Sequence, residues 1–218
     1  MTMIEVRPDA DVLLVVDVQN DFCPGGRLAA PGGDEVVAPI NRLMTRFDHI
    51  VLTQDWHPTD HQSFASAHPG RKPYETISLP YGPQVLWPDH CVQGTPGAGF
   101  RPDLDLTPAQ LVLRKGCDRR IDSYSAFMEN DRTTATGLGG YLRERGLRRV
   151  FLAGIAFDFC VLWSAEDAHR QGFEVIVIED ACRGIDVDGS VAEARRRLQA
   201  LHIPCVVSAG IVPALVTP

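Results

Sequence analysis

The chain has 218 residues, of which 44% are hydrophobic, enough for one large domain with a substantial buried core. Its 21 basic and 28 acidic residues give a formal net charge of -7, and this balance leaves no footprint for nucleic acid or an anionic membrane surface. No apolar run reaches the roughly 18 residues that span a bilayer, and positions 1–11 carry charges where a signal peptide would be apolar. We therefore expect a cytoplasmic protein that binds a small neutral or cationic molecule.

Short apolar runs alternate along the chain with segments of helical periodicity. The apolar runs, several of them rich in β-branched residues, predict six strands at residues 12–18, 50–53, 111–113, 150–153, 175–178 and 205–207. The amphipathic segments predict helices at residues 35–47, 133–145, 158–171 and 190–201. This alternation predicts an α/β fold, in which residues 1–218 form a single domain around a doubly wound, mainly parallel six-stranded sheet with helices on both faces.

The segment 55–108 breaks this rhythm. It holds many Pro and Gly residues, four of the seven histidines and two of the three tryptophans, and it shows no clear helix. A loop this long in a compact domain is usually functional, and α/β sheets bind ligands at the carboxyl edge where the strand-to-helix junctions open. A dinucleotide site is not expected, because the nearest glycine-rich string, 137–142, lacks the third glycine of that fingerprint and follows no strand.

One of the six cysteines stands apart from the others. The chain has no C-x-x-C pair, so the cysteines are expected to be free thiols. Helical periodicity after the fourth strand places Cys160 in the first turn of a helix, where the helix dipole can lower the pKa of a thiol. The unpaired amides around residues 156–160 could also receive an oxyanion when the thiolate attacks a carbonyl. The alternative is that Cys160 is a small buried hydrophobic residue.

Two charged residues follow other predicted strands. Asp17 ends the first strand and is placed like a general acid or base, although an Asp in this position can also cap a turn. Lys115 follows the third strand and could be a cation beside a thiolate, although a Lys after a strand is usually solvated. Both would lie at the same edge of the sheet as Cys160.

A group of histidines and one carboxylate could bind a metal ion. Asp55 and His57 project to the same side of an extended segment and could share one cation. A third ligand from His90 would leave coordination positions open for water and substrate, as in catalytic metal sites. His61 could be a further ligand or could orient one of the others. The alternative is a surface loop with solvated histidines.

Six ordered segments carry a family resemblance: DVQNDF at 17–22, QDWHP at 54–58, WPDHCVQGTPG at 87–97, KG at 115–116, DSYSAF at 122–127 and GIAFDFCV at 154–161. Together they resemble the nicotinamidases (pyrazinamidases) of the isochorismatase-like cysteine hydrolases, from the first strand to the helix after Cys160. The resemblance implies the isochorismatase-like hydrolase fold. It also implies an amidohydrolase of NAD salvage that converts nicotinamide to nicotinate and ammonia through a thioester and also hydrolyses pyrazinamide.

The same resemblance assigns roles to particular residues. The implied catalytic residues are Asp17, Lys115 and Cys160, the metal ligands Asp55, His57 and His90, the substrate-binding aromatic residues Phe22, Trp87 and Tyr124, and the oxyanion-binding amides those of Ala156 and Cys160. The implied cofactor is one divalent metal ion, zinc, with manganese and iron as alternatives. The family has a cis peptide bond before the residue that matches Ala156. Phe157 departs from the family pattern, in which a small polar residue is usual, and the sequence leaves its effect on the pocket edge open.

Two other functions stay open at this stage. Another amidase of the same superfamily, acting on a carbamoyl or acyclic amide, would generally lack the Asp-x-His pair and the later His. A non-catalytic metal-binding or regulatory module would have an inert Cys160, which would resist iodoacetamide. The sequence also leaves open whether the chain forms a homo-oligomer.

Overall fold

The computed structural model describes residues 3–213, and its centre is a six-stranded parallel sheet. In chain order the strands are β2 (Asp11–Val16), β3 (Ile50–Asp55), β6 (Leu111–Lys115), β7 (Arg149–Ile155), β8 (Glu174–Arg183) and β9 (Cys205–Val206). Their order in space is β6-β3-β2-β7-β8-β9. Each predicted strand lies in this sheet, so the predicted α/β fold is confirmed.

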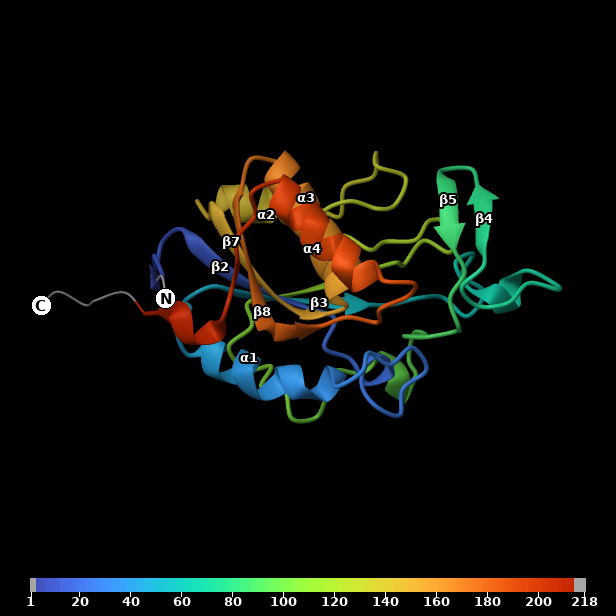
Figure 1. Ribbon diagram of the computed structural model, residues 1–218, viewed down its shortest axis with the longest axis horizontal. Helices are drawn as coiled ribbons and strands as arrows, with labels where there is room; N and C mark the ends of the chain where they lie inside the picture. The colour runs from blue at the N-terminus through green and yellow to red at the C-terminus, as the bar shows by residue number, and fades with distance from the viewer. Residues whose placement is uncertain (1–2, 214–218) are drawn as a thin grey trace, which may run out of the picture.

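Helices cover both faces of the sheet. Helix α1 (Val37–Met44) lies on one face, and α2 (Leu138–Glu144), α3 (Leu162–Arg170) and α4 (Ser190–Ala200) lie on the other (Figure 1). Successive strand residues point to opposite faces, so Leu13 packs in the core with α1 while Leu14 packs in the core with α2, α3 and α4. This two-sided burial explains why the strands read as continuous apolar runs. Among residues 3–213, no helix is long and apolar enough to cross a membrane.

The predicted helix at 133–145 begins later than expected, at Leu138. The amides and hydroxyls of Thr133 and Thr134 donate hydrogen bonds to the Asp131 carboxylate, which holds these residues in a turn. Side chains that bond to nearby backbone in this way compete with helix formation. Gly137, with a φ of 97°, then leads into α2.

The predicted helix at 158–171 also begins differently. It opens with a π-helical turn, Phe157–Val161, in which the Val161 amide donates to the Ala156 carbonyl at 3.0 Å, and α3 follows. Cys160 therefore lies in a π turn and not in the first turn of an α-helix. Single π turns of this kind occur frequently at functional sites.

The long segment 55–108 contains more structure than the sequence indicates. It includes the hairpin of β4 (Thr76–Leu79) and β5 (Gly82–Val85), which stands beyond the carboxyl ends of the central strands (Figure 1). A second small sheet pairs β1 (Ile4–Glu5) with β10 (Ile211–Val212). Both were missed, because two to four residues are too few to show a period.

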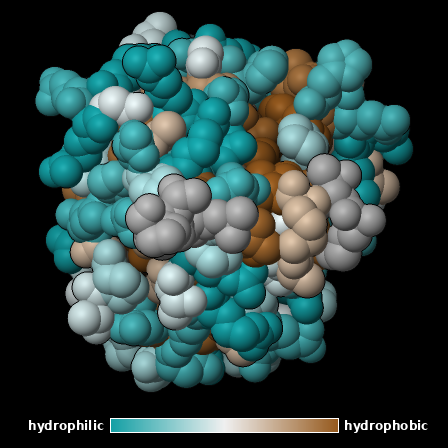
Figure 2. All heavy atoms as spheres, turned by 90° about the vertical axis from the view of Figure 1, so that its left-hand side faces the viewer, coloured by the Kyte–Doolittle hydropathy of each residue, from teal (hydrophilic) through white to brown (hydrophobic). Residues whose placement is uncertain are grey.

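The connections of the sheet define where a ligand can enter. From β2 the chain builds outward through β3 to β6, and from β7 it builds outward through β8 to β9 on the other side. Strands β2 and β7 therefore flank a topological switch point, whose carboxyl end is where open α/β sheets bind ligands. Figure 2 views the opposite end, at the amino ends of the strands, where hydrophilic residues predominate around a band of hydrophobic ones. The polar site must be sought at the other end.

Gly154 allows β7 to pass close beside β2. We therefore expect its replacement by alanine to destabilise the fold more than the same change at Gly146, a glycine in an open turn. The φ of Gly154 is 123°, and a Cβ there would lie 2.1 Å from the Val16 carbonyl oxygen. We expect Gly154→Ala to lower the free energy of unfolding by more than about 2 kcal/mol, since it adds a backbone clash to a strained φ. Gly146→Ala is the matched control, because Gly146 has a φ of 75° but nothing within 4 Å of its Cβ. It should cost only about 1 kcal/mol. Equal losses in denaturant unfolding would contradict this account.

Candidate active site

Three predicted residues from three strand ends lie together at the carboxyl edge of the sheet. Asp17 follows β2, Lys115 ends β6, and Cys160 lies in the turn after β7. The Lys115 Nζ is 2.8 Å from Asp17 Oδ2 and 3.5 Å from Cys160 Sγ. All three side chains are buried. The sheet therefore brings a carboxylate, an ammonium and a thiol into one cluster.

Burial controls the protonation of this cluster. It raises the pKa of the Cys160 thiol well above its ordinary value, although Lys115 opposes the shift. Burial also raises the pKa of Asp17, again against Lys115. The lowered thiol pKa suggested by the sequence is therefore wrong in direction, because the thiol is removed from water and faces carboxylates. A protonated thiol beside a carboxyl group of raised pKa suits proton transfer at the moment of attack.

The turn that carries Cys160 is firmly held. The Ser164 hydroxyl donates to the Cys160 carbonyl at 2.6 Å and accepts the Ala126 amide at 2.8 Å. The Ile155–Ala156 peptide bond before this turn is cis, as the family resemblance implies. Phe157 does not line the cavity, because its ring is buried in the core and faces the Arg195 guanidinium of α4.

Asp55 joins this cluster to the predicted metal ligands. The register of β3 and β6 sets Asp55 opposite Lys115, and its Oδ1 lies 3.0 Å from Lys115 Nζ. Its other oxygen, Oδ2, lies 2.9 Å from His57 Nε2 and 3.3 Å from His90 Nε2. Although burial alone would raise the pKa of Asp55, His57 and Lys115 hold that pKa well below its usual range.

The hydrogen bonds of the two histidines show that this set fits a metal ion. His57 Nδ1 lies 3.0 Å from the Gly116 carbonyl, and His90 Nδ1 lies 2.8 Å from the Pro88 carbonyl. Since a carbonyl only accepts, each Nδ1 carries a hydrogen. Although burial alone would lower the His57 pKa, the Asp55 carboxylate raises it, so without a metal ion the His57 Nε2 is protonated and pairs with Asp55. A metal ion would displace that proton and leave a lone pair on each ring. Two such lone pairs and the Asp55 carboxylate then face one another, an arrangement that a divalent cation stabilises. The donor set thus supports a divalent metal site.

His61 is buried beside this set but uses both of its ring nitrogens within the protein. Its Nδ1 accepts the Ser63 amide at 3.1 Å and contacts the Ser63 hydroxyl at 2.7 Å. Its Nε2 therefore carries the hydrogen and points to the Ile121 carbonyl at 3.3 Å. His61, His57 and Asp122 form a second possible donor set. To bind a metal, His61 would have to give up its bond to Ile121.

A cavity opens beside Lys115 and Cys160, and aromatic rings form one part of its wall. The predicted residues Phe22, Trp87 and Tyr124 all line it. The Trp87 indole N–H donates to the Tyr124 hydroxyl at 3.0 Å, which fixes both rings. Phe159, missed by sequence reasoning, packs edge-on against Trp87 with ring centroids 4.8 Å apart. Its position directly before Cys160 was the signal that could have identified it.

Two further wall residues, Leu28 and Ile185, gave no signal in the sequence because they come from loops without periodicity. Ile185 is held in place by Asp158, whose carboxylate accepts the Ile185 amide at 3.0 Å and the Asp186 amide at 2.8 Å. Asp158 therefore fixes the backbone at this part of the apolar rim.

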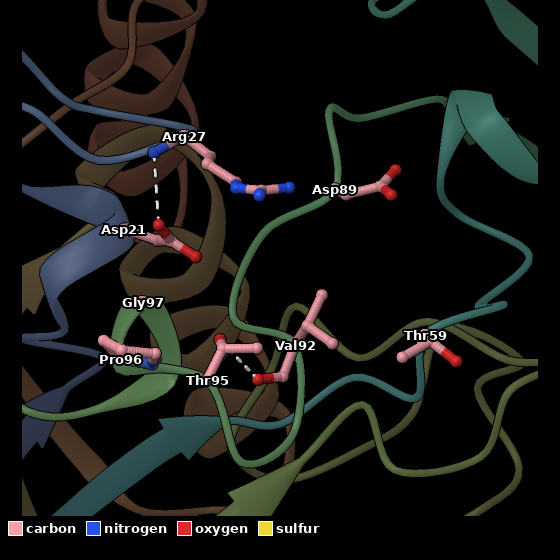
Figure 3. A pocket seen from close by; sticks show the side chains of 8 residues that line it. All are labelled: Asp21, Arg27, Thr59, Asp89, Val92, Thr95, Pro96 and Gly97. Atoms are coloured by element: carbon pink, nitrogen blue, oxygen red, sulfur yellow. Dashed lines mark hydrogen bonds between the residues drawn. The ribbon is translucent and has the colours of Figure 1, made fainter.

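A second hollow, of about 360 Å³, lies behind one wall of the cavity (Figure 3). Asp21, Arg27 and Asp89 line this hollow, and each directly precedes a residue that lines the cavity. Asp21 accepts the Arg27 amide at 3.2 Å and the Cys91 amide at 2.7 Å, so one buried carboxylate ties two segments of this wall together. The Arg27 side chain extends across the hollow toward the segment that carries Asp89 (Figure 3).

The fold and the cluster define an α/β protein with a candidate cysteine nucleophile at the carboxyl edge of a parallel sheet. The isochorismatase domain family matches residues 11–207, and the chain belongs to this family. Among its relatives, a nicotinamidase from Acinetobacter baylyi is 57% identical over 200 residues, covering 92% of this chain and 94% of the relative.

Solved structures of similar proteins agree with this assignment. PnC1 from L. infantum in complex with nicotinate is 37% identical, with a TM-score of 0.86 over 97% of this chain and 100% of that one. A pyrazinamidase from Pyrococcus horikoshii in complex with zinc is 34% identical, with a TM-score of 0.69 over 95% of this chain and 99% of that one.

Glu129 is a half-buried carboxyl group near this site. Its Oε2 is buried and has no hydrogen-bond partner among the residues that the structure describes. Burial raises the pKa of Glu129 to about 7, although contacts with Ser123 and Lys115 oppose the shift. Glu129 therefore becomes a poorly solvated carboxylate as the pH rises through about 7.

This predicts a pH-dependent gain in stability on substitution. A raised pKa in the folded state adds stability below the unfolded pKa, and that stability is lost as pH rises through about 7. We expect Glu129→Gln to gain stability relative to the wild type between pH 5 and pH 8. Urea unfolding at both pH values measures the change. If the free energies of unfolding of variant and wild type differed by the same amount at pH 5 and pH 8, the raised pKa of Glu129 would be contradicted.

Proposed function

We propose that this chain is a nicotinamidase, a metal-dependent cysteine amidohydrolase that converts nicotinamide to nicotinate and ammonia. The observation that carries the proposal is the Asp17, Lys115 and Cys160 cluster, in which Lys115 and Cys160 line a cavity with aromatic walls beside a histidine and aspartate donor set. The nicotinamidase at 57% identity and the nicotinate-bound relative support the substrate. Pyrazinamide presents the same carboxamide on a similar flat ring, so it would be a second substrate.

The aromatic wall suits a flat heteroaromatic substrate. In the proposed complex the pyridine ring lies between Phe22 and Trp87, with Tyr124 beside it. This orientation directs the carboxamide to the floor of the cavity, where Cys160 lies. An acyclic amide would leave the aromatic faces uncovered, which disfavours the other amidases of the superfamily.

Asp55, His57 and His90 would hold the divalent metal ion. When bound, the ion supplies a Lewis-acidic centre that attracts the ring nitrogen of the substrate. We propose zinc, which the Pyrococcus horikoshii relative binds, while manganese and iron also accept one carboxylate and two imidazoles.

The chain's own residues would carry out the chemistry. Asp17 accepts the Cys160 proton as the sulfur attacks the carboxamide carbon, and Lys115 stabilises the developing thiolate. The amides of Ala156 and Cys160 receive the oxyanion. Asp17 then passes its proton to the leaving nitrogen, ammonia departs, and a thioester remains. Asp17 next removes a proton from water, which hydrolyses the thioester to nicotinate and regenerates the thiol.

The nucleophile assignment predicts the outcome of one substitution. Cys160→Ala should lower ammonia release from nicotinamide by at least about a thousandfold, because no thioester can form. Cys205→Ala is the matched control, since Cys205 is an exposed residue of β9 and should keep wild-type activity. Appreciable amidase activity in Cys160→Ala would show that the nucleophile is another residue.

The metal assignment predicts a loss in binding. We expect chelation to abolish activity and added zinc, manganese or iron to restore it. The substitution His57→Ala should raise KM by about tenfold or more and reduce the amount of bound metal, because it removes one ligand. His49→Ala, a change at a half-buried histidine that precedes β3 and does not line the cavity, should do neither. Elemental analysis alongside kinetics measures both. Full activity in protein that contains no metal would overturn the assignment.

The remaining alternatives give different results in the same assay. Metal-loaded protein that releases no ammonia from nicotinamide, but whose Cys160 is alkylated by iodoacetamide, would be a cysteine hydrolase with another substrate. Absence of both ammonia release and Cys160 alkylation would indicate a non-catalytic module. A single catalytic domain and a cytoplasmic location stay predictions, and whether the chain forms a homo-oligomer stays open.

A further inference from the structure

The Thr53 hydroxyl contacts Asp17 at two points. Thr53 lies in β3 and is fully buried. Its Oγ1 accepts the Asp17 amide at 3.1 Å and donates to Asp17 Oδ1 at 2.6 Å. One side chain thus fixes both the backbone and the carboxylate of Asp17.

The backbone of Asp17 needs this support. Its φ is 48°, a left-handed conformation that residues other than glycine rarely adopt. Strand β2 has already ended at Val16, and its last pair with β3 is Val15 with Leu52. Asp17 is the first residue after β2, and its amide donates to the Thr53 hydroxyl in place of a backbone carbonyl of the neighbouring strand.

Because Thr53 bonds to only one carboxylate oxygen of Asp17, the two oxygens have different partners. Oδ1 is occupied by Thr53, while Oδ2 lies 2.8 Å from Lys115 Nζ. Within residues 3–213, Oδ2 accepts no hydrogen bond of good geometry, although it is buried. It is therefore the oxygen left to take a proton from Cys160, whose sulfur contacts the same ammonium.

We propose that Thr53 is a positioning residue, whose hydroxyl holds Asp17 so that Oδ2 faces the Cys160 thiol. The proposal rests on the proposed function, since it takes Asp17 as the group that moves the proton. It requires a hydroxyl in particular, because the group must both donate and accept. Valine has a similar shape and can do neither, whereas serine can do both.

The chain offers a closely matched control in Thr136. Its hydroxyl also donates and accepts, to the Ala126 carbonyl at 2.6 Å and from the Leu138 amide at 3.2 Å. It lies before α2 and does not line the cavity. Thr136→Val therefore removes the same pair of hydrogen bonds at a place where no proton is transferred.

The test measures kcat and KM for ammonia release from nicotinamide. Thr53→Val should lower kcat by about tenfold or more and leave KM within about twofold, because acid–base geometry is lost while the binding walls are kept. Thr53→Ser should recover most of the rate, and Thr136→Val should match the wild type. A wild-type kcat in Thr53→Val, a serine variant as slow as valine, or a change confined to KM would overturn the proposal.

Two further measurements keep the test decisive. Thr53→Ala replaces the valine variant if thermal unfolding shows that the latter does not fold. The rate of Cys160 alkylation by iodoacetamide needs no substrate, so it tests Thr53 even if nicotinamide is not hydrolysed. Slower alkylation in the variants that lack the hydroxyl supports the positioning role, and equal rates in variant and wild type exclude it. Failure of the wild type to release ammonia would count against the proposed function alone.

Discussion

The candidate site depends on one buried ammonium group. Lys115 is 1% exposed, and its Nζ contacts a carboxylate oxygen of Asp17, one of Asp55, the Ser123 carbonyl and the Cys160 sulfur. A charge in this position is costly unless it is paired and hydrogen-bonded, and removing one member of a buried pair costs about 3–5 kcal/mol. The contacts of Lys115 therefore fix the relative positions of three strand ends and of the turn that carries the thiol.

The topology of the sheet explains how these groups come together. Lys115 and Asp55 are paired by the register of β6 and β3, and Asp17 follows the next strand, β2. Cys160 reaches the cluster from β7, on the other side of the switch point. Cores packed on both faces hold these strands rigidly, while the aromatic wall and the apolar rim come largely from loops. The groups proposed to act on the substrate thus lie at strand ends and in the turn after β7, whereas much of the cavity wall comes from loops.

Much of this site could be predicted from the sequence. Apolar runs located the strands, and Asp17, Lys115 and Cys160 stood out because each follows one of them. The metal donors were recognisable as a carboxylate and histidines at metal-binding spacing. The motif resemblance added the aromatic residues. These features are all local in the sequence.

What the sequence could not show depends on contacts between distant segments. The direction of the Cys160 pKa shift follows from burial beside two carboxylates, which a helix-terminus argument cannot register. Leu28 and Ile185 reach the cavity on loops without a period, and Thr53 reads as an ordinary β-branched strand residue until its bond to Asp17 is seen. The pattern of apolar residues was enough to predict the fold, whereas the direction of the pKa shifts depends on which side chains the folded structure brings together.

Asp17 and Asp55 share the same ammonium, yet their surroundings push their pKa values apart. Burial raises the pKa of Asp17, whereas Asp55, although equally buried, has His57 as a further partner and a pKa well below its usual range. Such divergence separates a group that exchanges protons from one that stays ionised. Asp55 gives one oxygen to Lys115 and the other to the two histidines. A single side chain at the end of β3 therefore links the Asp17, Lys115 and Cys160 cluster to the histidine donor set.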